Sequence, residues 1–256
     1  APHKIDTAPL LTNPSAIHNT AQKIEERNAM LRGEQPKGCQ YCWNIENMGA
    51  DYISDRKTRS SSIYNEERLN AVKQGGAEFN VNPEYLEVSF GNGCNYRCGY
   101  CSPQASTLWM DEIKKHGNYD LTYNQYGIDF LEHGTYYGPK DDNPYVEAFW
   151  KWWPDLRKDL HTLRITGGEP LMNPGAMQFF DLLENEPAPQ LEISINSNLG
   201  VTTQKMDKMY SRVQSLQSQN KIKKFSLFTS IEGWGSQAEY MRTGLQCSHW
   251  ERNFLE

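Results

Sequence analysis

The chain has 256 residues, of which 38% are hydrophobic and 12% aromatic, and its formal net charge is −6. This length and aromatic content favour a folded protein of one or two domains over a disordered chain. The acidic balance argues against general nucleic-acid binding, and no run approaches the roughly 20 apolar residues of a membrane helix.

Apolar residues recur at helical spacing near the start of the chain. They predict a first helix over residues 13–33, with Asn13 or Ser15 as its N-terminal cap and Gly33 as its end. A second helix is predicted over residues 66–74. The polar, uneven stretch around it indicates a domain boundary, which we place between residues 82 and 83.

From residue 83 onward, strand-like and helix-like segments alternate. Strands are predicted over residues 85–90, 163–166, 191–195 and 225–231, and helices over 146–160, 174–184, 203–217 and from 237 onward. Residues 103–146 are interpreted as an insertion, and Pro154 is expected to bend or restart its helix. This alternation predicts an α/β fold with parallel strands, as a small doubly wound sheet or the first part of a larger barrel.

Six cysteines are too few for a disulfide scaffold in a chain of this length, and most of them are clustered. They stand as a pair, a group of three and a single residue: Cys39 and Cys42; Cys94, Cys98 and Cys101; Cys247. Tight cysteine clusters are typical of metal ligands, so we expect a reducing, cytoplasmic environment. The single thiol is predicted to be buried as a small apolar group.

The group of three has the spacing C-x3-C-x2-C and begins about four residues after a predicted strand. Clustered thiolates require a soft metal, and a structural zinc site needs a fourth ligand. Three thiolates on a 4Fe–4S cluster leave one iron open to a substrate. A zinc site completed from a distant residue and three buried thiols are the alternatives.

This loop resembles the cluster loop of the radical S-adenosylmethionine (radical SAM) superfamily, a C-x3-C-x-aromatic-C motif after the first barrel strand, with Tyr100 as the aromatic residue. The resemblance continues at the ends of the next three predicted strands. The matching elements are Gly167-Gly168-Glu169-Pro170; Ser194, Asn196 and Asn198; and Ser230-Ile231-Glu232-Gly233. By resemblance, the three cysteines bind a 4Fe–4S cluster and the downstream elements contact S-adenosylmethionine (SAM).

The side chains of these elements suit that ligand. Glu169 suits an ammonium group, and Asn196 and Asn198 can bind hydroxyls and carboxylates. Arg242 could reach a carboxylate as a bidentate donor, although a surface position on a helix is expected for it. Each element also has a simpler reading: a strand-to-helix turn for Gly-Gly-Glu-Pro, turn chemistry for the asparagines, and a solvated turn residue for Glu232.

The resemblance implies an enzyme with a partial TIM-type barrel, a (β/α)6 core truncated after about four units. In this family a reduced cluster splits SAM into methionine and a 5′-deoxyadenosyl radical, which abstracts a hydrogen atom from the substrate. A protein nucleophile or acid–base pair is therefore not required. The implied partners are SAM and an electron donor such as flavodoxin or ferredoxin. A degenerate member without turnover and a non-catalytic zinc-binding protein are the competing hypotheses.

The stretch around Cys39 and Cys42 resembles the end of a SPASM or twitch module, which holds an auxiliary iron–sulfur cluster. The matching residues include Trp43, Glu46, Ser54 and Arg56. A zinc half-site, a redox pair and two free thiols are the alternatives. Because such modules accompany enzymes that modify peptides and proteins, a peptide or protein is the favoured substrate, ahead of RNA, and a small metabolite stays open.

Overall fold

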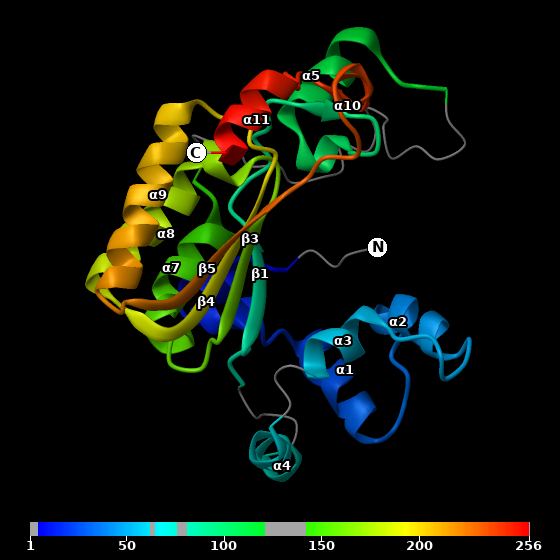
Figure 1. Cartoon of the computed structure of the whole chain (residues 1–256). Helices are drawn as coiled ribbons and strands as arrows, with labels where there is room; N and C mark the ends of the chain where they lie inside the picture. The colour runs from blue at the N-terminus through cyan, green and yellow to red at the C-terminus, as the bar shows by residue number, and fades with distance from the viewer. Residues whose placement is uncertain (1–4, 62–64, 76–80, 121–141, 256) are drawn as a thin grey trace. The chain divides into compact units, whose positions relative to one another are not determined.

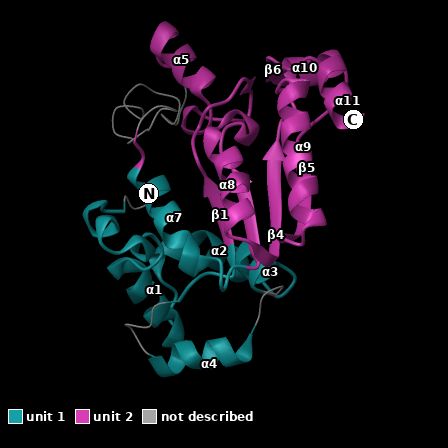
Figure 2. Ribbon diagram, turned by 90° about the vertical axis from the view of Figure 1, so that its left-hand side faces the viewer, with its two compact units in different colours: residues 1–85, 144–160 teal, residues 86–143, 161–256 magenta. Residues whose placement is uncertain are grey.

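The computed structural model describes residues 5–61, 65–75, 81–120 and 142–255. Two compact units share the chain: residues 1–85 with 144–160, and residues 86–143 with 161–256 (Figure 2). The predicted division into residues 1–82 and 83–256 stays a prediction. The first compact unit ends at residue 85, close to the predicted boundary, but it also includes residues 144–160.

The first unit is helical among its described residues. Its elements are η1 (Ala8–Leu11), η2 (Pro14–Ile17), α1 (Ala21–Leu31), η3 (Lys37–Cys39), α2 (Gln40–Glu46), α3 (Asp55–Ser61), α4 (Glu66–Gly75) and α7 (Pro144–Leu156). The helix predicted over residues 66–74 is confirmed as α4. The short helix α3 was not predicted, because its sequence is polar throughout.

The helix predicted over residues 13–33 is wrong in its first half. The chain forms the short 3-10 helix η2, then breaks, and α1 begins after Thr20. The Thr20 hydroxyl accepts a hydrogen bond from the Lys23 amide at 3.2 Å and so caps α1. The predicted end is confirmed, since Gly33 follows α1 with a φ of 80°, a left-handed conformation that glycine adopts without strain.

The second unit contains a four-stranded sheet with the strand order β1-β3-β4-β5 (Figure 1). Its elements are β1 (Tyr85–Ser89), β2 (Arg97–Cys98), η4 (Pro103–Ala105), α5 (Thr107–His116), β3 (Thr162–Thr166), η6 (Pro170–Met172), α8 (Pro174–Asn185), β4 (Ala188–Ser197), α9 (Thr203–Ser218), β5 (Ile222–Thr229), α10 (Ser236–Met241), β6 (Arg242–Thr243) and α11 (Cys247–Leu255). β4 pairs in parallel with β3 and with β5, as the alternation of strands and helices predicts. The α/β fold is confirmed, and closure into a barrel stays a prediction.

The two faces of this sheet differ in polarity. One face is apolar and fully buried, formed by Leu163, Ile165, Leu191, Ile193 and Ile195. α8 and α9 lie side by side over it (Figure 1), and Phe180 of α8 contacts Phe225 of β5 edge-on at 6.1 Å. The other face carries polar residues, among them Arg164 and Ser194, which are register partners in β3 and β4. This polar face is therefore not part of the apolar core, and a ligand can contact it.

Residues 103–146, interpreted as an insertion, contain helix α5, and residues 121–141 of that stretch lie outside the described residues; the insertion stays a prediction. Two other predictions are corrected. The helix predicted over 146–160 is α7, which runs through Pro154 and ends two residues later. The continuous helix expected from residue 237 is broken by β6 and by Gly244, whose φ is 110°.

Ser106 caps α5 and lies in the core, and its loss should destabilise the second unit. Its hydroxyl donates to the Tyr96 carbonyl at 2.8 Å and accepts from the Trp109 amide at 3.4 Å. Replacing Ser106 by alanine leaves that buried carbonyl unpaired, so we expect a loss of about 1–2 kcal/mol in the free energy of unfolding by urea. Thr202→Ala is the matched control, because Thr202 precedes α9 without a side-chain cap bond, and an equal loss there would contradict the assignment.

Among the described residues, none of the helices has the length and apolar character needed to cross a membrane. The cytoplasmic location stays a prediction.

Candidate functional site

A cavity of about 290 Å³ lies at the carboxyl ends of the strands in the second unit. Cys94, Cys98 and Cys101 all line it, so the loop after β1 brings the three predicted ligands to one place. The residues after β3, β4 and β5 line the same cavity; they are Gly167, Gly168, Asn198 and Ser230. Strand ends of a parallel sheet share one edge, which explains why elements far apart in sequence meet here.

The cysteine loop is fixed by pairing with a distant part of the chain. β2 pairs antiparallel with β6, so that Cys98 lies opposite Arg242. The Gly99 amide donates to the Met241 carbonyl at 2.9 Å, and the Trp109 indole donates to the Cys98 carbonyl at 3.0 Å. Backbone and side chain together therefore hold this part of the loop in place.

Cys94, which is half-buried, lies beside Asn198 and Glu169. Burial raises the pKa of its thiol to about 11, with a smaller contribution from the Glu169 carboxylate. The side-chain amide nitrogen of Asn198, Nδ2, lies 3.8 Å from the Cys94 sulfur and donates to Asn95 Oδ1 at 2.9 Å. Asn198 Oδ1 also accepts from the Gly200 amide at 2.7 Å, so the turn chemistry expected for this asparagine is present beside its contact with the cysteine loop.

The two glycines after β3 pack directly against the cysteine loop. The Gly168 amide donates to the Gly91 carbonyl at 3.3 Å, and the Glu169 amide donates to the Gly93 carbonyl at 2.7 Å. A Cβ at residue 168 would overlap backbone atoms of Asn92 and Gly93. Gly167 has a φ of 122°, which other residues rarely adopt. The Gly-Gly pair is thus needed for close approach of two backbones.

Glu169 is buried, and its carboxylate is surrounded by donors. It accepts hydrogen bonds from the Leu171 amide at 3.0 Å, the Ser197 hydroxyl at 2.9 Å and the Asn198 amide at 2.7 Å. Burial raises the pKa of this carboxyl group, and the three donors oppose that effect. Glu169 therefore ties the start of η6, where Pro170 is buried, to the end of β4.

The surface helix position expected for Arg242 is wrong. Arg242 lies in the short strand β6 and is 4% exposed. Its Nε and Nη2 donate to the two carboxylate oxygens of Glu232, each at 2.6 Å, and the Tyr100 hydroxyl donates to Glu232 Oε1 at 2.7 Å. The hydrogen bonds from Arg242 lower the pKa of Glu232. A bidentate partner satisfies the guanidinium, which explains how this arginine tolerates burial.

The polar face of the sheet forms another wall of the cavity. Glu87 of β1, Arg164 of β3 and Asn196 of β4 line it. Arg164 Nε donates to Asn196 Oδ1 at 3.0 Å, and its distance to the Glu87 carboxylate is 3.9 Å. Ser194 lies two residues before Asn196 on the same face, outside the set of residues that line the cavity.

Sequence reasoning missed Glu87 and Arg164 as candidate site residues. Both are charged residues inside short strands, where a half-buried sheet alternates apolar and polar positions. The alternation Leu163, Arg164, Ile165 was the available signal, since it places the arginine on the face opposite the core.

The first unit holds the pair Cys39 and Cys42 at the start of α2, both partly exposed. The residues that carry the resemblance to an auxiliary module lie together beside them. Ser54 and Arg56 both donate to the Glu46 carboxylate, and the Arg56 guanidinium lies 3.9 Å above the Trp43 ring. These contacts fix the turn from α2 to α3.

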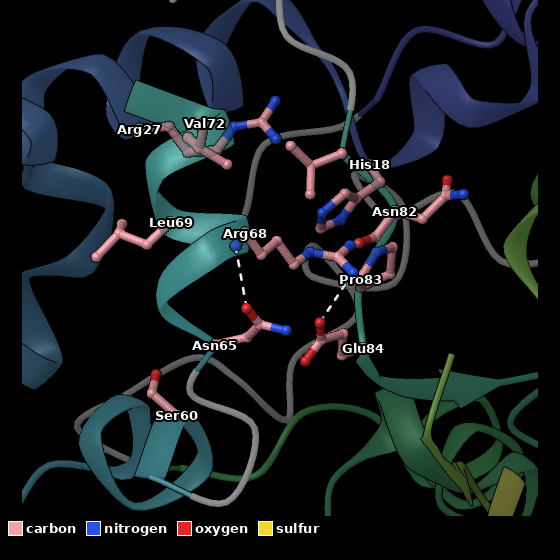
Figure 3. Close-up of a pocket in the computed structure, with 11 residues that line it drawn as sticks. His18, Arg27, Ser60, Asn65, Arg68, Leu69, Val72, Asn82, Pro83 and Glu84 are labelled. Atoms are coloured by element: carbon pink, nitrogen blue, oxygen red, sulfur yellow. Dashed lines mark hydrogen bonds and ion pairs between the residues drawn. The ribbon is translucent and has the colours of Figure 1, made fainter. Parts of the chain in front are cut away.

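A second cavity, of about 320 Å³, lies within the first unit (Figure 3). Arg68 crosses it, pairs with Glu84 at 2.8 Å and donates to the Asn82 carbonyl. Burial lowers the pKa of His18 to about 4, together with the positive charges of Lys23, Arg27 and Arg68, so the ring is neutral at pH 7. The Glu84 carboxylate thus partly balances the positive charges of Arg27 and Arg68, which line the same cavity.

The chemistry of the first cavity fits an iron–sulfur cluster. Within the described ranges, no three His, Cys, Asp or Glu side chains are grouped to hold a single metal ion. Three soft thiol ligands instead surround one cavity, and in a 4Fe–4S cluster each thiolate binds a different iron. Amide and guanidinium donors next to two of the sulfurs suit ligands that carry negative charge when bound.

Comparison with known proteins gives the family. The family model described as the radical SAM superfamily matches residues 88–217, just over half of the chain. A stretch of 121 residues is 32% identical to the protein named GTP 3′,8-cyclase of Hydrogenovibrio crunogenus (strain DSM 25203 / XCL-2); it is 47% of this chain and spans only 28% of that relative. No solved structure matches the chain. The cysteine cavity lies at the strand ends of the matched region, and the chain belongs to the radical SAM superfamily of enzymes.

Proposed function

We propose that the second unit binds a 4Fe–4S cluster through Cys94, Cys98 and Cys101 and cleaves SAM reductively. The observation that carries this proposal is the arrangement of all three thiols and the glycines after β3 around one cavity. Membership of the radical SAM superfamily supports it, because that family implies both the cluster and SAM.

When bound and reduced, the cluster supplies the electron that splits a carbon–sulfur bond of SAM, giving methionine and a 5′-deoxyadenosyl radical. The residues of this chain bind and orient. Gly167 and Gly168 let the cysteine loop lie close against the backbone that follows β3. Asn196, Asn198 and Ser230 line the cavity and offer amide and hydroxyl groups to the ligand.

Glu169 has a more restricted role in this proposal. Its Oε1 already accepts two hydrogen bonds and its Oε2 accepts one, so Oε2 keeps the capacity to accept a hydrogen bond from the ammonium group of SAM. Tyr100 lines the same cavity, and its hydroxyl donates to the Glu232 carboxylate.

For the substrate, we favour a peptide or protein. The cavity wall made by Glu87, Arg164 and Asn196 is polar and carries both charges, which suits a substrate rich in hydrogen-bonding groups. The name of the matched cyclase states action on GTP, but the shared stretch covers too little of that relative to extend its substrate to this chain.

The pair Cys39 and Cys42 supports a further part of the proposal, an auxiliary iron–sulfur site of the SPASM or twitch kind in the first unit. The supporting observation is local. The segment around the two cysteines folds into one compact turn, in which Trp43 is buried and donates to the Pro36 carbonyl at 3.0 Å. Two thiols do not complete a cluster, so other ligands must contribute.

Anaerobic reconstitution with iron and sulfide tests the proposal. We expect about four irons and four sulfides per chain from the loop of the second unit, and more if the auxiliary site also forms. After reduction by dithionite, or by flavodoxin or ferredoxin, added SAM should yield 5′-deoxyadenosine, measured by mass spectrometry. Bound zinc without sulfide would favour the alternative, a non-catalytic zinc-binding protein. Iron binding without 5′-deoxyadenosine would favour a degenerate member of the family.

A further inference from the structure

A buried cation lies beside one of the three cysteines of the loop. Arg242 Nη1 lies 3.8 Å from the Cys98 sulfur, within the range of a hydrogen bond to sulfur. The two residues are register partners in the β2–β6 ladder, so backbone pairing sets their separation. Arg242 is 4% exposed, and water therefore screens its charge little.

The direction of this guanidinium is fixed from the opposite side. Nε and Nη2 are both bound by Glu232, which leaves Nη1 directed at the sulfur. Glu232 is itself held by the Tyr100 hydroxyl, and the Arg242 guanidinium lies 5.5 Å from the Tyr100 ring. The side chain of Glu232 is 34% exposed, so the carboxylate forms the outer member of the pair.

We propose that Arg242 and Glu232 form a charge pair that sets the reduction potential of the cluster bound by Cys98, with Arg242 raising the potential and Glu232 lowering it. This inference rests on the proposed function. Reduction adds one negative charge to a cluster, and a cation or a hydrogen-bond donor at a ligand sulfur stabilises that charge. A nearby carboxylate has the opposite effect.

In this proposal Arg242 acts on the reduction potential of the cluster and does not bind SAM. Two of its nitrogen atoms are committed to Glu232 and a third faces Cys98, so the bidentate fork is already occupied. A carboxylate of SAM would have to displace Glu232 to gain the same contact.

The test compares Arg242→Gln and Glu232→Gln in the whole chain after anaerobic reconstitution. The midpoint potential of the cluster is measured by redox titration followed by electron paramagnetic resonance, in the absence of SAM. We expect a more negative potential for Arg242→Gln and a more positive one for Glu232→Gln. Arg97→Gln is the control, because Arg97 precedes Cys98 but pairs with Glu112, and it should shift the potential less than Arg242→Gln does.

Opposite shifts support the inference, since a purely structural role would not change sign between the two variants. Equal potentials, or shifts in the same direction, would overturn it while the proposed function stands. If Arg242→Gln does not retain a cluster, Glu232→Gln decides alone: a rise supports the charge pair, and no change or a fall overturns it. A wild-type chain without a 4Fe–4S cluster would overturn the proposed function itself and the inference with it.

Discussion

Replacing Cys98 by alanine should abolish both cluster binding and the formation of 5′-deoxyadenosine. Cys98 is one of three proposed ligands, and a site with two thiolates cannot hold a cluster that needs three. The substitution also leaves Arg242 Nη1 facing a methyl group in place of a sulfur. We expect iron and sulfide content to fall to background after reconstitution, and product to fall below detection by mass spectrometry.

Cys247→Ala is the matched control for this experiment. Cys98 and Cys247 are both 7% exposed, but the Cys247 thiol donates to the Gly235 carbonyl at 3.4 Å and lies in α11, outside the loop. Cys247→Ala should retain iron and product. A brown, iron-loaded Cys98→Ala protein that still cleaves SAM would refute the assignment of the loop.

Replacing Gly168 by alanine should displace the cysteine loop without removing any ligand. The new methyl group would overlap backbone atoms of Asn92 and Gly93, which cannot move aside as a flexible side chain does. Overpacking of this kind costs about 1–3 kcal/mol in the free energy of unfolding. Because Cys94 follows Gly93 directly, we also expect a several-fold loss of iron retained after reconstitution.

Gly233→Ala separates this steric effect from a general effect of removing glycine. The nearest atoms to a Cβ at residue 233 lie at 3.8–4.0 Å, which is ordinary contact. We expect its urea midpoint and iron content to match those of the wild type. If Gly168→Ala behaved in the same way as Gly233→Ala, the two backbones would not be in the contact described above.

The elements that depend on local patterns could be predicted from the sequence. The strands β3, β4 and β5 follow from their strand-forming residues, and the spacing of the three cysteines, together with Tyr100 and the motifs after the next strands, indicates the family. α5 also has local signals: Ser106 at its start, Gly117 at its end and basic residues in its last turn. The many Gly, Asn, Tyr and Asp residues that follow it in the stretch 103–146 obscure that pattern.

Arg242 shows what local patterns cannot predict. A single arginine in a helical-looking stretch is most often exposed, whereas here the pairing with Glu232 stabilises it in a buried position. That pairing in turn depends on the strand β6, whose two residues have no strand signature of their own and form a ladder only because β2 lies opposite. Such two-residue strands are set by the packing of distant segments.

The β2–β6 ladder also has a consequence for the order in which the protein matures. Cys98 and Arg242 are 144 positions apart in the chain. On the ribosome, the cysteine loop emerges long before the segment that pairs with it, because synthesis proceeds at about 5–20 residues per second. Until residue 243 has emerged, the loop lacks its antiparallel partner and its neighbouring cation. The proposed cluster therefore requires a loop geometry that forms late, after nearly the whole described chain has been synthesised.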